Sequence, residues 1–202
     1  MSTIALTTFL KIISLNTTNS QIAEIDRLFS GSEGGYDYYR ELKRVVPKIA
    51  KGDLTSKDVG EDLKRLSKPH ERRDNVAGSK TFEKWWTKAD RVFVPPPKTD
   101  IFGNDQQLIR IRIKPEIAYE EDGVLHVMQL WNTARPDLTT TIAGVGVDLM
   151  RRRLAKGKFS EAKFEVFDMR KNKIRTEANI PNNSEIILRS DIAKLSSIAE
   201  SL

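Results

Sequence analysis

The side chains whose types and spacing could do chemistry gather in residues 108–131. Apolar and charged residues alternate in its first half, which is the two-residue period of a half-buried strand. Asp122-Gly123 then predicts a tight turn, because glycine tolerates a positive φ without steric cost. The return run, residues 124–131, is apolar apart from His126 and Gln129, which is typical of a strand covered on both sides. We therefore expect a hairpin with one charged strand and one buried strand.

Glu116 and Gln129 are the candidate catalytic residues of this hairpin. Glu116 follows Pro115, which lacks a backbone donor and so predicts an interruption, a bulge or an edge position in the first strand. Its carboxylate could bind a divalent cation, since Mg²⁺ prefers oxygen ligands. The structural alternative for Glu116 is a solvated strand carboxylate paired with Arg112 or Lys114, a pair worth about 0–1 kcal/mol. The alternative for Gln129 is a buried, hydrogen-bonded amide.

Lys114-Pro115-Glu116, the turn, and a buried strand ending in Gln129-Leu130-Trp131 together resemble the core of the PD-(D/E)XK nucleases, over residues 108–155. In that family an acid on one strand and an acid-x-Lys motif on the next hold a divalent metal beside the scissile phosphate. Glu116 matches the first acid, whereas Gln129 replaces the second acid and Trp131 replaces the lysine. The resemblance therefore implies a nuclease-like fold without the catalytic pair. The structural alternative for Trp131 is a core or rim aromatic.

The charge balance is compatible with a polyanionic partner such as nucleic acid. The chain of 202 residues carries 34 Lys and Arg against 28 Asp and Glu, a formal net charge of +6. Two groups of basic residues are the candidate nucleic-acid contacts: Arg110, Arg112 and Lys114 on the charged strand, and Arg151, Arg152 and Arg153 in a helix expected over residues 136–156. Arginine binds phosphate bidentately. A structural alternative for the second group is that cations are favourable at a helix carboxyl end.

Residue counts and missing motifs exclude several kinds of chemistry. The absence of cysteine excludes disulfides, thiolate metal ligands and a cysteine nucleophile, and two histidines argue against a zinc site or a histidine-based triad. The sequence lacks the common nucleotide-binding, zinc-protease and hydrolase motifs. We expect no metal and no cofactor, with Mg²⁺ required only if the nuclease hypothesis holds. The apolar run 4–15 is too short to span a bilayer and contains Lys11, so we expect a cytoplasmic protein without a membrane partner.

The element pattern predicts an α+β fold, with an amino-terminal helical region followed by a small mixed sheet packed with helices. We expect three parts: a helical region over residues 1–92, a proline-rich linker over 93–107 and a mixed α/β domain over 108–202. The helical region is expected to contain a charged loop at residues 70–80. Further strands are predicted around residues 164–169 and 174–180, and a final helix is predicted to begin at Ser190 or Asp191.

Three functions are compatible with these features. The first is a nuclease-like domain that is catalytically inactive and binds nucleic acid or a protein partner. The second is a structural or assembly protein that acts through homo-oligomerisation, for example through the apolar run 4–15. The third is a metal-dependent nuclease with a rearranged site. In it Glu116 would be one metal ligand, and Glu120, Asp137 or Gln129 would complete the set. Lys114 would be the nearest lysine. We favour the first, and enzymatic activity is not expected from it.

Overall fold

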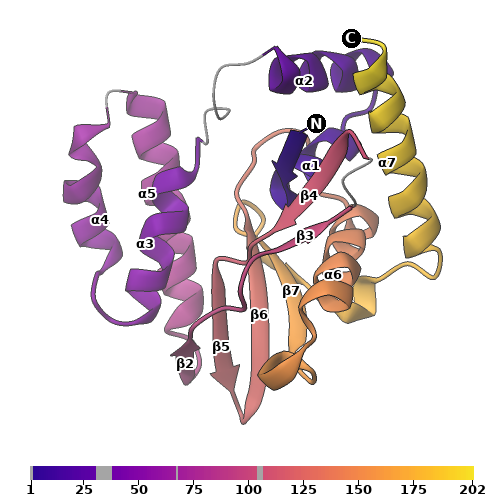
Figure 1. Cartoon of the computed structure of the whole chain (residues 1–202). Helices are drawn as coiled ribbons and strands as arrows, with labels where there is room; N and C mark the ends of the chain where they lie inside the picture. Colours follow the sequence, from indigo (N-terminus) through magenta and orange to yellow (C-terminus); the bar gives the residue numbers. More distant parts are fainter. Residues whose placement is uncertain (1, 31–37, 67, 104–106) are drawn as a thin grey trace.

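The computed structural model describes residues 2–30, 38–66, 68–103 and 107–202. These residues form an α+β fold with two mixed β-sheets, as the sequence predicts (Figure 1). The strands are β1 (Ser2–Ala5), β2 (Arg91–Val94), β3 (Asp100–Phe102), β4 (Ile109–Ile113), β5 (Ile117–Glu121), β6 (Val124–Trp131), β7 (Lys163–Asp168) and β8 (Lys173–Arg175). The α-helices are α1 (Leu6–Ile13), α2 (Thr18–Phe29), α3 (Arg40–Ala50), α4 (Ser56–Asp62), α5 (Pro69–Trp86), α6 (Thr140–Leu154) and α7 (Ser184–Glu200).

The predicted hairpin is confirmed in β5 and β6, which pair antiparallel with Ile117 opposite Met128. Asp122 and Gly123 form its turn with φ values of 51° and 73°. The charged first strand, however, is two strands in two different sheets, because the chain breaks at Pro115. Residues before the break form β4 and residues after it form β5. A proline cannot donate a ladder hydrogen bond, so it lets the chain leave one sheet and enter another.

The larger sheet has the strand order β2-β5-β6-β7-β8. Its neighbours are antiparallel except β6 and β7, which are parallel and are connected by α6. Parallel strands need such a crossover. The carboxyl ends of β6 and β7 therefore lie side by side, with Trp131 opposite Asp168. The smaller sheet has the order β1-β4-β3, in which β1 pairs parallel with β4.

Two hydrophobic cores cover the two faces of the larger sheet. Helices α3, α4 and α5 lie on one face, where Phe82, Tyr119 and Phe167 are part of a core that these helices share with the sheet. The opposite face is covered by α6, by α1 and α7, and by the smaller sheet (Figure 1). Its core contains Trp131 and the inward isoleucines of β4. The chain thus forms three layers with the larger sheet in the middle.

Several local predictions for the amino-terminal half are wrong. Residues 1–92 are not only helical, because β1 and β2 are strands; β1 comes before the apolar stripe of α1. The loop expected over residues 70–80 lies inside the 18-residue helix α5, which starts with Pro69 at its first position. That segment is polar on its outer side but buries Asn75, Ser79 and Phe82, so its inward face is too polar to stand out as an apolar stripe. Residues 93–107 include β3.

The carboxyl-terminal half differs from its prediction in three places. The helix expected over residues 136–156 is α6, which begins at Thr140 and so excludes Pro136. The strand predicted over 174–180 ends at Arg175, and a short 3₁₀ turn, Glu177–Asn179, follows it. The last helix begins at Ser184, before Ser190 and Asp191. The strand around 164–169 is confirmed as β7. Gly144 permits the close approach of this 3₁₀ turn to α6, because a Cβ at Gly144 would lie 2.0 Å from the Asn179 carbonyl oxygen.

Candidate functional site

The structure brings the two candidate residues of the hairpin together. One carboxylate oxygen of Glu116, Oε2, accepts hydrogen bonds from the Gln129 Nε2 at 2.5 Å and from the Leu130 backbone N–H at 2.8 Å. Gln129 is only 3% exposed, which confirms the structural alternative of a buried amide. Trp131 is 1% exposed and belongs to the core, as its structural alternative predicts. Glu116 is therefore not the solvated, Arg112-paired carboxylate of the structural alternative.

The cation whose charge acts on the Glu116 carboxyl group comes from a distant part of the sequence. Burial raises the pKa of Glu116, and the positive charge of Lys43 on α3 opposes that rise. Neither Arg112 nor Lys114 has this role, although both lie closer in the sequence. A lysine on α3 can approach the start of β5 because α3 packs against β2, the neighbour of β5 in the sheet. No local pattern in the sequence indicates this contact.

A cleft of about 730 Å³ lies at the carboxyl end of β6. Its floor includes Leu130, Trp131 and the loop that follows β6, at the carboxyl ends of the parallel strands. One wall comes from β1, α1 and α2, and the other comes from the start of α3 and from Asp74 on α5. Open α/β sheets bind ligands at this end of their strands. Glu116 does not line the cleft, but Lys43 does.

The cleft is basic. Among the lining residues that the structure describes, five cations outnumber the two carboxylates, Glu24 and Asp74, which gives these residues a net charge of +3. The cations are Lys11, Arg27, Lys43, Arg112 and Arg135.

These cations differ in whether a carboxylate already holds them. Lys11 and Arg27 both pair with Glu24, at 2.8 Å and 2.5 Å. The side chains of Arg112 and Arg135, by contrast, form no hydrogen bond or ion pair with any residue that the structure describes. Both residues are exposed. Two guanidinium groups are therefore available in the cleft for an anionic ligand.

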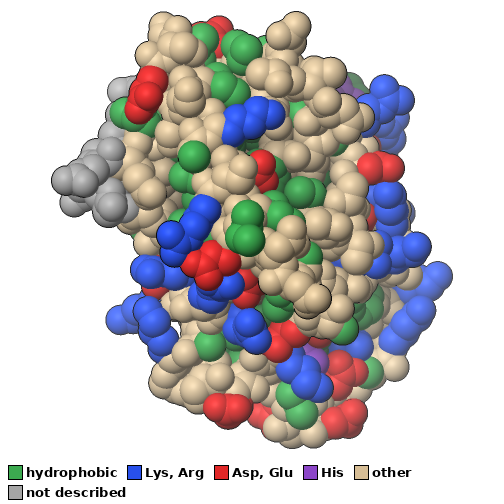
Figure 2. All heavy atoms as spheres, turned by 90° about the vertical axis from the view of Figure 1, so that its right-hand side faces the viewer, with side chains coloured by type: hydrophobic (Ala, Val, Ile, Leu, Met, Phe, Trp, Pro, Cys, Tyr) green, Lys and Arg blue, Asp and Glu red, His purple; other side chains and the backbone are tan. Residues whose placement is uncertain are grey.

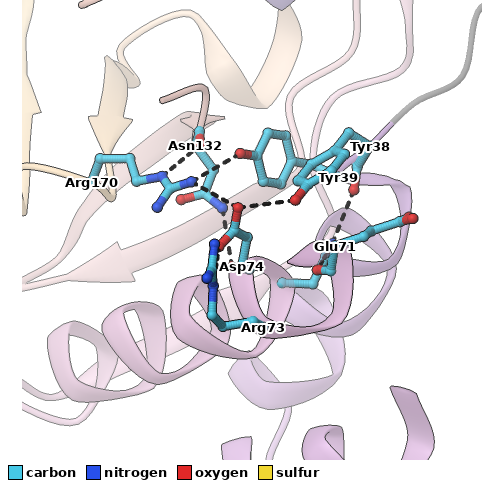
Figure 3. Close-up of polar contacts among 8 residues, drawn as sticks. Tyr38, Tyr39, Glu71, Arg73, Asp74, Asn132 and Arg170 are labelled. Carbon is cyan, nitrogen blue, oxygen red and sulfur yellow. Dashed lines mark hydrogen bonds and ion pairs between the residues drawn. The ribbon is translucent and has the colours of Figure 1, made fainter. Parts of the chain in front are cut away.

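A polar network around Asp74 forms the wall on the side of α5 (Figure 3). The Asp74 carboxylate accepts a hydrogen bond from the Tyr38 hydroxyl at 3.0 Å and pairs with Arg170 at 3.2 Å. The same Arg170 guanidinium donates to the Tyr39 hydroxyl at 3.2 Å and to the Asn132 carbonyl oxygen at 3.1 Å. The network joins the turn before α3, helix α5, the end of β6 and the turn after β7, and so holds the two tyrosines in place.

The protonation of this network follows from its contacts. Burial opposes ionisation of Asp74, but hydrogen bonds from Tyr38 and Arg73 and the charge of Arg170 lower its pKa overall. Burial and the hydrogen bond to Asp74 raise the pKa of Tyr38 to about 12. Tyr38 therefore keeps its proton at neutral pH and donates a hydrogen bond to an ionised Asp74.

The residues around Glu116 do not fit the divalent metal that the PD-(D/E)XK resemblance implies. Mg²⁺ takes several oxygen ligands in octahedral geometry, whereas Glu116 Oε2 already accepts two N–H groups. Glu120 lies about 13 Å further along the strand and is exposed, and Asp137 pairs with Lys171 at 3.0 Å. In the part of the chain that the structure describes, no group of three or more His, Cys, Asp or Glu residues could hold a metal.

The predicted basic residues separate into two places. Arg112 lines the cleft, and Arg110 lies on the same face of β4, while Lys114 is exposed beyond the end of that strand. The other three pair with carboxylates on α6, α7 and β3. The shortest distances between charged atoms are 3.3 Å for Arg151 to Asp148, 2.8 Å for Arg152 to Glu185 and 2.7 Å for Arg153 to Asp100. Figure 2 views the face of the molecule that carries α6 and α7, where basic and acidic side chains lie next to one another.

Several cleft residues have no signal in the sequence. Lys43, Tyr38, Tyr39, Asp74 and Arg135 come from segments that reasoning from the sequence assigns to packing or to loops. They meet only because α3 and α5 pack beside the end of β6.

Comparison of the chain with models of known protein families and with curated proteins finds no match. Among the helices in the described ranges, none has the length and apolarity needed to cross a membrane.

Proposed function

We propose that this protein is a nuclease-like domain that lacks the nuclease catalytic pair and binds nucleic acid through the cleft. The observation that carries the proposal is the pair of arginines, Arg112 and Arg135, that line the cleft without a carboxylate partner in the described structure. Surface arginines are often paired, as Arg151, Arg152 and Arg153 are here. Two guanidinium groups without a carboxylate partner favour a phosphate-bearing ligand, since the described lining residues of the cleft carry a net charge of +3.

The Glu116–Gln129 contact supports the inactive form of this fold. Gln129 donates its amide to the carboxylate that would otherwise hold a metal, and Lys43 supplies the positive charge on that side. The positive charge of Lys43, which lines the cleft, opposes the rise that burial causes in the Glu116 pKa. Glu116 is thus held by an amide and a backbone N–H group and needs no metal as a partner.

The proposal is tested by the anisotropy of labelled single-stranded and duplex oligonucleotides at two salt concentrations. We expect affinity to fall steeply with salt, because bound phosphates release counterions. In the double variant Arg112→Gln/Arg135→Gln, the slope of log K against log salt should become shallower by about 1.4 to 1.8. The matched control is Lys80→Gln/Lys163→Gln, which removes two exposed charges outside the cleft. Absence of binding by either nucleic acid, or equal losses in both double variants, would contradict the proposal.

A cleavage assay separates this proposal from an active nuclease. We expect no cleavage of DNA or RNA by the native protein in the presence of Mg²⁺ or Mn²⁺, since the donor set around Glu116 does not suit either ion. Metal-dependent cleavage that is lost in Glu116→Ala would establish the rearranged nuclease instead.

Assembly through oligomerisation is the second candidate. Two edge strands expose large apolar side chains: Val92 on β2 is 62% exposed and Ile101 on β3 is 40% exposed. Exposed apolar edges favour pairing with another chain. If they support a dimer, light scattering should report twice the monomer mass, and Val92→Lys should restore the monomer. A monomer at every concentration tested would remove this candidate.

A further inference from the structure

The shape and lining of the cleft point to one form of nucleic acid. This step rests on the proposed function and names its ligand more closely. A volume of about 730 Å³ is that of a pocket for a small molecule. A duplex presents phosphates and groove edges, and its bases are stacked inside, so it could contact only the rim of such a cleft. An unpaired strand can place its bases inside.

Apolar and aromatic side chains lie between the cations of the cleft. Leu28 lines one wall, Leu42 and Tyr39 line the opposite wall, and Leu130 and Met169 line the floor. Phosphates gain nothing from these groups, whereas unstacked bases do, because every base has an apolar face. A lining that mixes guanidinium groups with apolar side chains therefore suits a strand whose backbone and bases both enter.

The two tyrosines of the wall are fixed with their hydroxyls already used. Tyr38 donates to Asp74 and Tyr39 accepts from Arg170, as Figure 3 shows. Their rings lie edge to face with centroids 4.8 Å apart. The Tyr38 ring also stacks on the His70 ring, with centroids 5.8 Å apart. Tyr39 lines the cleft and also packs against the core that α3, α4 and α5 share with the sheet, so its ring is held in place. A ring held in advance loses little entropy when a base packs on it.

We infer that the cleft binds single-stranded nucleic acid, with bases packed against Tyr39 and the neighbouring apolar side chains and with phosphates on Arg112 and Arg135. Duplex DNA or RNA is then a weaker ligand that contacts the rim. Stacking of a base on an aromatic side chain tolerates every sequence, so we expect little sequence preference.

The first test uses the native protein and needs no variant. Anisotropy is measured with a labelled oligothymidylate of about 10 nucleotides, within the range of single-strand site sizes, and with a duplex of the same length. We expect the single strand to bind at least about 10-fold more tightly, as one or two stacked bases would give. A duplex that binds equally or more tightly would overturn the inference and leave the proposed function standing. If neither binds, the proposed function itself fails.

The second test asks whether the ring of Tyr39 contributes. Tyr39→Leu is expected to weaken single-strand binding by about 10-fold, and Tyr39→Phe to weaken it less, since the phenylalanine keeps the ring. Phe93→Leu on β2, outside the cleft, is the matched control for the loss of an aromatic side chain. Thermal unfolding checks that each variant folds. Equal losses in Tyr39→Leu and Phe93→Leu would overturn the inference.

If Tyr39→Leu does not fold, photo-crosslinking of the native protein replaces the variant. A bromouridine-substituted single strand is irradiated with the protein, and the modified peptides are identified by mass spectrometry. We expect crosslinks on the start of α3 or on residues 132–135, which line the cleft. Crosslinks confined to α6 or α7 would overturn the inference.

Discussion

The larger sheet carries two glutamates that differ in what surrounds them: Glu116, which precedes β5, and Glu165 on β7. Glu165 accepts the Tyr119 hydroxyl at 2.8 Å and contacts the His126 Nδ1 at 3.0 Å, and the network ends there. Glu116 accepts hydrogen bonds from a backbone N–H group and the Gln129 amide, and Lys43, whose charge acts on its pKa, lines the cleft. Burial of a carboxylate therefore does not by itself indicate a functional site in this protein. The link to a cavity distinguishes the two.

Aromatic side chains surround the hydrogen bonds of Glu165. The Tyr119 ring stacks on His126 with centroids 4.7 Å apart, and Trp85 and Trp86 pack edge to face against it at 5.4 Å and 5.8 Å. Burial and the neighbouring Glu165 raise the pKa of Tyr119, so the phenol remains a hydrogen-bond donor. Such a satisfied network specifies one arrangement of a core. We interpret it as structural.

The largest loss of stability is expected for substitutions of Glu165. Glu165→Ala would leave both the Tyr119 hydroxyl and the His126 ring nitrogen without their buried partner, and should cost about 3 kcal/mol of unfolding free energy. Urea denaturation measures this loss. Glu165→Gln keeps an acceptor and should cost less. Because none of these residues lines the cleft, binding of nucleic acid by the folded Glu165→Ala protein should match the native value. A folded variant that no longer binds would break the comparison.

The next largest effect concerns the contact between Glu116 and Gln129. Gln129→Glu replaces a 2.5 Å hydrogen bond with two neighbouring carboxylates. Like charges at this distance favour a shared proton, so the variant should lose about 2 kcal/mol at neutral pH and less at acid pH, where one carboxyl group is protonated. Urea denaturation at the two pH values measures the difference. Equal losses at both would mean that Glu116 is already neutral in the native protein.

Glu116→Gln should show the opposite pH dependence with a smaller loss, about 1 kcal/mol at acid pH. The folded-state pKa of Glu116 is raised above its ordinary value of 4.5. The native protein therefore loses stability as pH rises from 4.5 through the raised pKa, because a buried carboxyl group must ionise. The glutamine variant has no such group, so its deficit should shrink over that window. A deficit that grows with pH would show that the carboxylate is stabilised by Lys43 more than burial opposes it.

The sequence predicted the hairpin well and the cleft poorly, for a physical reason. The Asp122-Gly123 turn and the apolar run to Trp131 are local signals, and the pairing of β5 with β6 follows from them. The break at Pro115 was visible as an interruption, but the choice of a different sheet for β4 depends on its pairing with β1, from the start of the chain. Lys43 and Arg135 reach the cleft only through such long-range packing, which no local period encodes.

The smallest effect tests the two groups of arginines against each other. Arg151 is half exposed and pairs with Asp148 at 3.3 Å, so Arg151→Gln should change stability by less than about 0.5 kcal/mol. Asp148 keeps its second partner, Arg152, at 2.9 Å. Since Arg151 lies outside the cleft, Arg151→Gln should change nucleic-acid affinity only by the small effect of lowering the net charge by one. Arg112→Gln should weaken binding more. Both variants remove one arginine from a chain of the same net charge, so anisotropy at one salt concentration compares their positions directly. If Arg151→Gln weakens binding as much as Arg112→Gln, the nucleic acid extends over α6, and the carboxylates that pair with its arginines are displaced when it binds.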